Sequence, residues 1–534
     1  MKSRKFILLY TAIIVVHILL ILYYGLQKEG FHEDEYYSYF TSAGNLNLYP
    51  YDSSLWELRG YDVQRQFLVT DEHRFDFKAI SKIQESDVHP PLYYLSLHFL
   101  MSLFPNRFYK WFGIGLNTIF SLISCCGVMF FFYCADKSRN RRLLACAAGL
   151  TYAIWPSVIS SVMFTRMYAM SAMWTVLYAD IFILLMTCSQ LGRKKFAALT
   201  ISGGIICYLS FLTHYFCLFM AFFLTLGYCI YTVVRRKGIG RMLIYGVVQV
   251  CFIGLAILAY PACLDHIFNG YRGEDTLSGL FDSAPFERLK LFLPIIDKNF
   301  FADLFAPSMI IFGLALAIVI FYLAKNRKTH LSSTDTNSWA LFICMMAGVL
   351  SVWILCRTSL FLGDSSSRYF YPVGAILLPL MSYCICKAGL LIHSEAKASV
   401  HKIPGILLAS LIAVPAILGT IKGNILFLYP ESGEKVRFSQ ENAQYPVVVI
   451  YNREAKHRSW FMANELWPYE HVIYLDYQEE QTIEDSPLLK TAEKLIVYVV
   501  GSEDILQRIV AGNEKLHTFT PLRSDTFFAV YVLE

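Results

Sequence analysis

The hydrophobic positions of this chain fall into long unbroken runs that are separated by short polar segments. Runs of about 16–24 apolar residues match the length that an α-helix needs to cross a bilayer. They lie at 6–26, 111–134, 143–163, 168–190, 196–212, 215–234, 242–262, 308–324, 339–356, 369–391 and 403–421. The pattern predicts a mainly α protein, a polytopic bundle of about eleven transmembrane helices.

The apolar run from Leu92 to Phe104 is different, because its roughly 13 residues are too few to span the hydrocarbon core. Counting it as a span would place the basic residues Arg139–Arg142 outside and invert every later loop. We therefore expect a helix that lies in, or re-enters, the outer interface.

Clusters of lysine and arginine separate the runs in a regular way. The positive-inside rule places such clusters in the cytoplasm. The first run follows the basic segment Met1–Lys5, is too long for a signal-peptide core and is not followed by a cleavage site, so we expect an uncleaved first span with a cytoplasmic N-terminus. The clusters are Lys137/Arg139/Arg141/Arg142, Arg193/Lys194/Lys195, Arg235/Arg236/Lys237/Arg241, Lys325/Arg327/Lys328 and Lys387/Lys397/Lys402.

After about residue 430 the pattern changes to short strand-like runs at 447–451, 472–475, 495–500 and 527–532. Helical stretches near 454–466 and 503–512 alternate with them, which predicts a small α/β domain. We divide the chain into a membrane module, 1–425, and an extracytoplasmic domain, 430–534. Within the module, 27–110 forms a first outer loop with interfacial helices.

Composition supports this picture. The chain is 56% hydrophobic and 16% charged, which is typical of a multi-pass membrane protein, here assigned to the plasma membrane. A net charge of +5 spread over loops does not indicate a nucleic-acid-binding protein. The 14 cysteines fall almost entirely inside apolar runs, so we expect no disulfide framework.

Five polar features lie at the outer ends of apolar runs. Their placement on one predicted face indicates a functional site at that depth. They are Glu33–Glu35, Asp87–Pro91 with His89, Arg166–Tyr168, His214–Tyr215 and Arg368–Tyr369.

The carboxylates Glu33, Asp34 and Glu35 sit among aromatic residues just past the first span. An apolar setting suits a carboxylate that accepts a proton from an acceptor hydroxyl, whereas the simpler interpretation is a solvated acidic loop. We take Asp34 and Glu35 as catalytic candidates and Glu33 as a substrate-binding candidate. We assign no cofactor; a divalent cation stays open, although we find no second ligand set at useful spacing.

Cations form the other half of the predicted site. His89 precedes two prolines at a helix start, where backbone donors favour a phosphate. Arg166 and Arg368, each with a tyrosine within the next two residues, suit a lipid phosphate, although arginines at span ends often extend to lipid head groups instead. We assign His89, Arg166, Arg368 and Tyr369 to phosphate binding. The further substrate-binding candidates are Tyr93, Tyr168 and His214.

Together these motifs resemble the C-type (GT-C) glycosyltransferases. The nearest group is glycosyltransferase family 39, with the dolichyl-phosphate-mannose protein mannosyltransferases and the bacterial aminoarabinose transferases of lipid A. The resemblance covers about residues 1–420 and is carried by Asp34-Glu35, His89-Pro90-Pro91-Leu92, Arg166-Met167-Tyr168 and Arg368-Tyr369-Phe370-Tyr371-Pro372.

The resemblance implies an inverting transfer of a sugar from a polyprenyl-phosphate donor to a lipid, protein or glycan acceptor outside the cytoplasm. Asp34 matches the family's catalytic aspartate, with Glu35 as its neighbour. His89 stands where aminoarabinose transferases have a lysine that contacts the lipid phosphate. The second acidic residue of some relatives has no match, because Ala169–Met173 is apolar.

A different class, a transporter or flippase of lipid-linked sugars, is the alternative. Transporters usually place polar sites at the midplane of repeated halves. This chain keeps its polar groups at the outer edge and shows no internal repeat.

Overall fold

The computed structural model describes residues 3–44, 55–187, 192–235, 238–281, 284–325, 334–395, 411, 413–452, 459–476, 486–499, 504–525 and 528–534. The described chain divides into two compact units, which are presented separately below. Unit 1 comprises 1–25, 84–93 and 113–426, and unit 2 comprises 26–83, 94–112 and 427–534.

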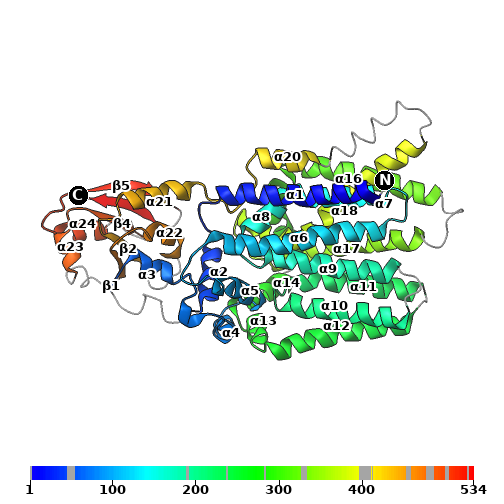
Figure 1. The fold of residues 1–534 in the computed structure, drawn as a ribbon, viewed down its shortest axis with the longest axis horizontal. Helices are drawn as coiled ribbons and strands as arrows, with labels where there is room; N and C mark the ends of the chain where they lie inside the picture. The colour runs from blue at the N-terminus through cyan, green and yellow to red at the C-terminus, as the bar shows by residue number, and fades with distance from the viewer. Residues whose placement is uncertain are drawn as a thin grey trace. The chain divides into compact units, whose positions relative to one another are not determined.

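Unit 1 is a bundle of long apolar helices (Figure 1). Because a bilayer offers no hydrogen-bond partners, helices that satisfy their own backbone are the structure such runs must adopt. Their bounds are α1 Ser3–Gln27, α6 Lys110–Ala135, α7 Arg141–Ile154, α8 Pro156–Met163, α9 Tyr168–Thr187, α10 Arg193–Phe211, α11 Cys217–Val234, α12 Ile239–Ala259, α16 Phe305–Lys325, α17 Thr334–Thr358, α18 Tyr371–Glu395 and α20 Ala413–Ile421.

Among the described residues, eight helices are long and apolar enough to cross a membrane, or nine if the bent pair α7–α8 is counted as one span. The chain is a multi-pass membrane protein. The other two of the eleven predicted spans are α10, a 19-residue helix with three basic residues at its start, and 403–421, which lies partly outside the described residues.

Helix α9 lies at the centre of this bundle. It packs against α10, α11, α17 and α18, and 78% of its apolar stretch is buried, against 11% in α16. The break between α7 and α8 follows from Pro156, which has no N–H to continue the helix, and the two helices meet at 52°. Trp155 at the break donates its indole N–H to the Phe300 carbonyl at 2.9 Å.

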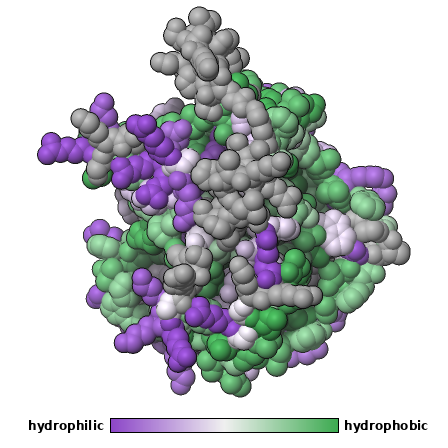
Figure 2. Space-filling model, turned by 90° about the vertical axis from the view of Figure 1, so that its right-hand side faces the viewer, coloured by the Kyte–Doolittle hydropathy of each residue, from purple (hydrophilic) through white to green (hydrophobic). Residues whose placement is uncertain are grey.

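Shorter helices connect the spans of unit 1. They are α13 Cys263–Phe268, α14 Tyr271–Phe281, α15 Pro285–Phe301 and the 3₁₀ helix η2 Ser365–Phe370. The end of the bundle that carries the N-terminus gathers hydrophilic side chains between hydrophobic ones (Figure 2). Several residues of the predicted clusters, Arg236, Lys237, Arg327, Lys328, Lys397 and Lys402, lie outside the described residues. Which face is cytoplasmic stays a prediction.

Unit 2 is built on a six-stranded mixed sheet in the order β1-β3-β2-β4-β6-β5. Parallel pairing of β2 with β3 and β4 forms its centre, and β1, β6 and β5 are antiparallel to their neighbours. The strands are β1 Leu55–Leu58, β2 Val447–Tyr451, β3 Val472–Asp476, β4 Leu495–Val499, β5 Phe519–Ser524 and β6 Ala529–Leu533.

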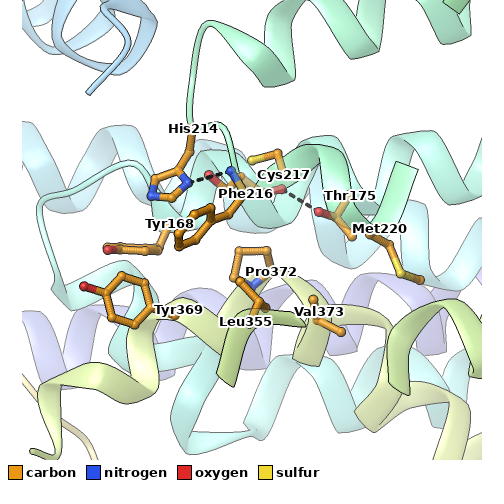
Figure 3. Close-up of a pocket in the computed structure, with 11 residues that line it drawn as sticks. Tyr168, Thr175, His214, Phe216, Cys217, Met220, Leu355, Tyr369, Pro372 and Val373 are labelled. Carbon is orange, nitrogen blue, oxygen red and sulfur yellow. Dashed lines mark hydrogen bonds between the residues drawn. The ribbon is translucent and has the colours of Figure 1, made fainter. Parts of the chain in front are cut away.

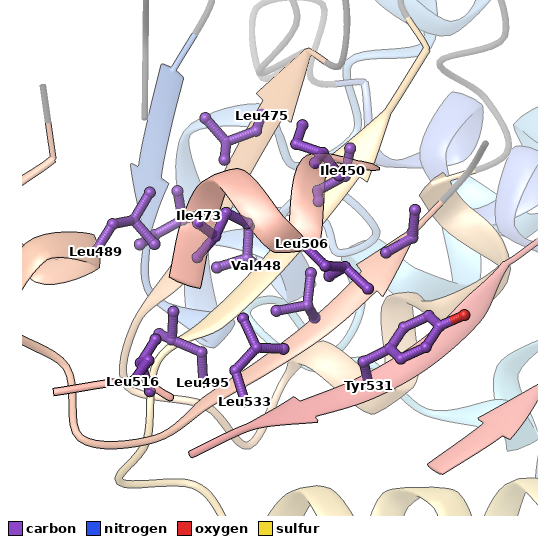
Figure 4. Close-up of a cluster of buried hydrophobic side chains, with 14 residues drawn as sticks. Val448, Ile450, Ile473, Leu475, Leu489, Leu495, Leu506, Leu516, Tyr531 and Leu533 are labelled. Atoms are coloured by element: carbon purple, nitrogen blue, oxygen red, sulfur yellow. The ribbon is translucent and has the colours of Figure 1, made fainter. Parts of the chain in front are cut away.

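Helices complete unit 2. They are α2 Glu33–Ala43, α3 Gly60–Arg65, α4 Phe77–Glu85, α5 Leu92–Ser102, α21 Glu431–Glu441, α22 Ala463–Leu466, α23 Pro487–Thr491 and α24 Asp504–Ala511, with the 3₁₀ helix η1 Asp71–His73. Helices α23 and α24 contribute Leu489 and Leu506 to a hydrophobic core against the sheet, together with Val448, Ile473 and Leu533 of the strands (Figure 4). Burying such branched side chains stabilises the domain by roughly 1.5–3 kcal/mol each.

The predicted fold class, a helical membrane bundle with a small α/β domain, is confirmed. The four predicted strands correspond to β2, β3, β4 and β6. The sheet has two further strands, and one of them, β1, comes from the segment 27–110 rather than from the C-terminal segment. Part of the predicted helix 454–466 lies outside the described residues.

Candidate functional site

The loop that carries His89 is held in place within unit 1 by two backbone anchors. Leu92 donates its N–H to the Leu212 carbonyl at 2.9 Å. Seven residues earlier, the Glu85 carbonyl lies 3.2 Å from Nε2 of the buried His266. Pro90 and Pro91 stiffen the segment between the anchors, so the position of His89 is fixed on both sides.

His89 lies beside a carboxylate. Its Nδ1 is 3.4 Å from Oδ2 of Asp87. Burial alone would raise the pKa of Asp87, but the hydrogen bond and positive charge of His89, together with Arg166, hold that pKa below its ordinary value. Asp87 is therefore an anion that faces His89 and Arg166.

His214 joins this cluster from the turn between α10 and α11. Its ring centroid is 6.0 Å from that of His89. Nδ1 of His214 accepts the Phe216 N–H at 3.1 Å, so the neutral ring carries its proton on Nε2. Burial, followed by the positive charges of His89, Arg166 and Arg368, lowers the pKa of His214 well below its ordinary value. The site thus holds His214 neutral and able to donate.

Two buried arginines complete the cluster. Arg166, 4% exposed, lies in the tight connection between α8 and α9, where its backbone N–H donates to the Phe164 carbonyl at 2.7 Å. Arg368, 3% exposed, lies in η2 directly before α18. Its guanidinium is stacked on Phe164, 5.6 Å from the ring centroid, and on Tyr369, at 5.3 Å. Such stacking fixes a guanidinium more firmly than it would fix an ammonium.

Next to the cations is a small, mainly apolar pocket lined by residues of α9, α11, α17 and α18 together with His214 and Tyr369. In Figure 3, His214, Tyr168 and Tyr369 lie at one end of it, and Met220 and Val373 lie at the other. The rings of Tyr168 and Tyr369 meet edge to face, with centroids 6.0 Å apart. One end of the pocket is therefore lined by polar rings and the other by mainly apolar side chains.

In unit 2, the three adjacent carboxylates occupy the first turn of α2. Glu35 is fully buried, and its Oε2 accepts from Nζ of Lys28 at 2.9 Å and from the His32 N–H at 2.8 Å. Asp34 is about a quarter exposed, with Oδ2 at 3.7 Å from Nδ1 of His32. Glu33 is half-buried in the same turn. Of the two catalytic candidates, Glu35 is engaged in holding the helix and Asp34 is accessible.

The structure thus brings His89, Arg166, His214 and Arg368 together in unit 1, with the tyrosines that follow the two arginines. Tyr93 is fully buried at the start of α5 and is not among the residues that line the pocket. That Asp34 faces the cations of unit 1 stays a prediction, as do the functional roles of all these residues.

Sequence reasoning left three residues without a role. Asp87 was part of a predicted polar feature, but its proximity to Arg166 depends on the fold. Lys28 and His266 carried no signal, because a lone lysine after a span and a lone histidine in a loop are both common. Within the described ranges, no group of three or more His, Cys, Asp or Glu side chains is arranged to hold a metal ion.

Comparison with solved structures places this arrangement in a known architecture. ArnT from Cupriavidus metallidurans bound to undecaprenyl phosphate superimposes with a TM-score of 0.51 at 11% identity, over 99% of this chain and 98% of that one. The apo form of the same protein superimposes with a TM-score of 0.51 at 12% identity, over 100% of this chain and 98% of that one. This chain has the GT-C fold.

A second GT-C protein, the oligosaccharyltransferase of Archaeoglobus fulgidus in its apo form, gives a TM-score of 0.52 at 11% identity. The match covers 97% of this chain and 70% of that one. No protein-family profile and no curated protein sequence matches the chain. The GT-C likeness is therefore one of fold.

Proposed function

We propose that this protein is a membrane glycosyltransferase. It transfers a sugar from a polyprenyl-phosphate donor to an extracytoplasmic acceptor with inversion, using Asp34 as the base. The observation that carries the proposal is the cluster of His89, Arg166, His214 and Arg368 beside an apolar pocket. A polyprenyl phosphate has the same two parts, an anionic head and a hydrocarbon chain.

The cations serve the leaving group. Breaking the bond between the anomeric carbon and the phosphate oxygen leaves an additional negative charge on the polyprenyl phosphate. Arg166 and Arg368 stabilise that charge, and neutral His214 donates through Nε2. Asp87 supplies the counter-charge that favours protonated His89. The solved ArnT complex holds undecaprenyl phosphate in the same fold, which supports a donor of this class.

Asp34 serves the acceptor. The acceptor oxygen forms the new bond to the anomeric carbon, its proton passes to the Asp34 carboxylate, and the phosphate leaves from the opposite face. A single displacement of this kind inverts the anomeric configuration. Glu35 is less suited to the same task, because its Oε2 already accepts from Lys28 and from the backbone of His32.

Purified full-length protein in lipid vesicles, given a panel of radiolabelled polyprenyl-phosphate sugars, tests the proposal. We expect label to move from one of these donors to an acceptor, with Asp34→Asn abolishing transfer while polyprenyl-phosphate binding persists. Arg368→Ala should weaken binding instead. If the intact donor crosses the vesicle bilayer without being cleaved, the protein is a flippase and the proposed transferase activity is wrong.

A further inference from the structure

Helix α2, which carries Asp34, is held by a lysine buried at the end of α1. Lys28 is completely inaccessible to solvent. Its Nζ donates to Oε2 of Glu35 at 2.9 Å and to the Phe427 carbonyl at 2.6 Å, and lies 5.2 Å from the centroid of the Phe31 ring. One ammonium therefore joins two chain segments that are about 400 residues apart in sequence.

Glu35 passes this restraint to the start of α2. The same Oε2 accepts the His32 N–H at 2.8 Å, and Nδ1 of His32 accepts the Asp34 N–H at 3.1 Å. This reciprocal capping box fixes the first turn of the helix. The backbone of Asp34 is consequently two hydrogen bonds away from the Glu35 carboxylate that Lys28 holds.

The segment around Phe427 packs closely against the residues that follow Lys28. Glu29 donates its N–H to the Leu428 carbonyl at 2.8 Å. A Cβ on Gly30 would lie 2.3 Å from Oγ of Ser432, and a Cβ on Gly433 would lie 1.4 Å from Oε2 of Glu29. Gly30 therefore has no room for a side chain, whereas a Cβ on Gly433 would displace the end of the Glu29 side chain.

The rest of α2 is packed on the C-terminal segment of unit 2. The hydroxyl of Tyr36 accepts the Asn464 N–H at 3.3 Å. The ring of Trp460 contacts both Tyr37 and Phe40, with centroid distances of 4.7 Å. Helix α2 is thus attached at its first turn through Lys28 and along its length through Trp460.

We propose that Lys28 is a positioning residue for the Asp34 base, anchored on the Phe427 backbone. The segment around Phe427 then serves the reaction by holding the start of α2. The inference rests on the proposed function. Lys28 acts through Glu35, so its loss should lower kcat and leave the donor KM unchanged, because a base displaced by about 1 Å costs up to 10²-fold in rate.

Two variants separate positioning from simple folding. Lys28→Met leaves Glu35 as a buried charge without its ammonium and should lower thermal stability. The double variant Lys28→Met/Glu35→Gln removes both charges, while the glutamine oxygen can still accept from His32. We expect the double variant to regain the melting temperature of the native protein but to keep a kcat at least tenfold lower, with an unchanged donor KM.

A matched control is Lys435→Met. Lys435 pairs with Asp525 at 2.7 Å in the same unit, and we expect its kcat to be native. Folded Lys28→Met/Glu35→Gln protein with native kcat would overturn the positioning role. A tenfold higher donor KM at native kcat would also overturn it.

The same experiment distinguishes failure of this inference from failure of the proposed function. If the native protein transfers sugar and the double variant does so equally well, only the positioning role is wrong. If the native protein cleaves no polyprenyl-phosphate sugar, the proposed function is wrong, and the positioning role is wrong with it.

Discussion

Nδ1 of His89 and Oδ2 of Asp87 lie 3.4 Å apart in a loop that is anchored at both ends. We expect Asp87→Asn to weaken polyprenyl-phosphate binding about tenfold at neutral pH, because His89 loses the counter-charge that favours its protonated form. Titration with polyprenyl phosphate measures this effect. Equal affinity in the variant would contradict a charged His89.

Arg368 should not be replaceable by lysine. Its guanidinium is stacked on Phe164 and Tyr369, and a flexible ammonium cannot reproduce that contact. We expect Arg368→Lys to raise the donor KM about tenfold by steady-state kinetics. Arg241→Lys is the control, because Arg241 is also placed over a ring, that of Phe196, but lies at the start of α12. Similar donor use in both variants would argue against a phosphate role.

His214 should make unit 1 sensitive to acid. Its pKa in the folded protein is well below 6.5, first because of burial and then because of the neighbouring positive charges. Below about pH 6.5 the unfolded chain binds a proton that the folded chain does not, so stability falls as pH falls, by at most about 1.4 kcal/mol per pH unit. The melting temperature of His214→Gln should therefore fall less between pH 7 and pH 5 than that of the native protein. Parallel pH profiles for the two proteins would contradict this assignment.

Gly60 has no room for a side chain. A Cβ there would lie 2.3 Å from the Trp467 carbonyl oxygen and 2.5 Å from that of Leu466. Because both neighbours are backbone atoms, we expect Gly60→Ala to destabilise unit 2 by about 1–3 kcal/mol in thermal unfolding. Gly115→Ala in α6, where no atom lies within 4 Å of the added carbon, should have a native melting temperature. A native Gly60→Ala melting temperature would show that this segment relaxes easily.

The membrane helices could be predicted because their signal is local. About 20 consecutive apolar residues have few alternatives to a membrane-spanning helix. The shorter run that begins at Leu92 forms α5, a helix of 11 residues, which is too short for a span, as the sequence predicts. The central strands β2, β3 and β4 were also predictable, since strands buried on both faces are continuously apolar.

The missed elements depend on partners that are distant in sequence. Strand β1 has four residues and pairs with a segment more than 400 positions away, and β5 contains Pro521, which weakens any strand signal. The pairing of Lys28 with Glu35 could not be predicted either. In the sequence Lys28 is one more cation beside a span, and only the fold shows that it is inaccessible to water.

The pairing of Leu55 with Leu475 has a consequence for biogenesis. At about 5–20 residues per second, the ribosome needs roughly 20–80 s after making Leu55 before Leu475 exists. During that time the first loop has no β3 to pair with and α2 has no Trp460 to rest on. A premature stop before Trp460 would remove both partners, so we expect truncated products to lack the packing that holds the helix carrying Asp34.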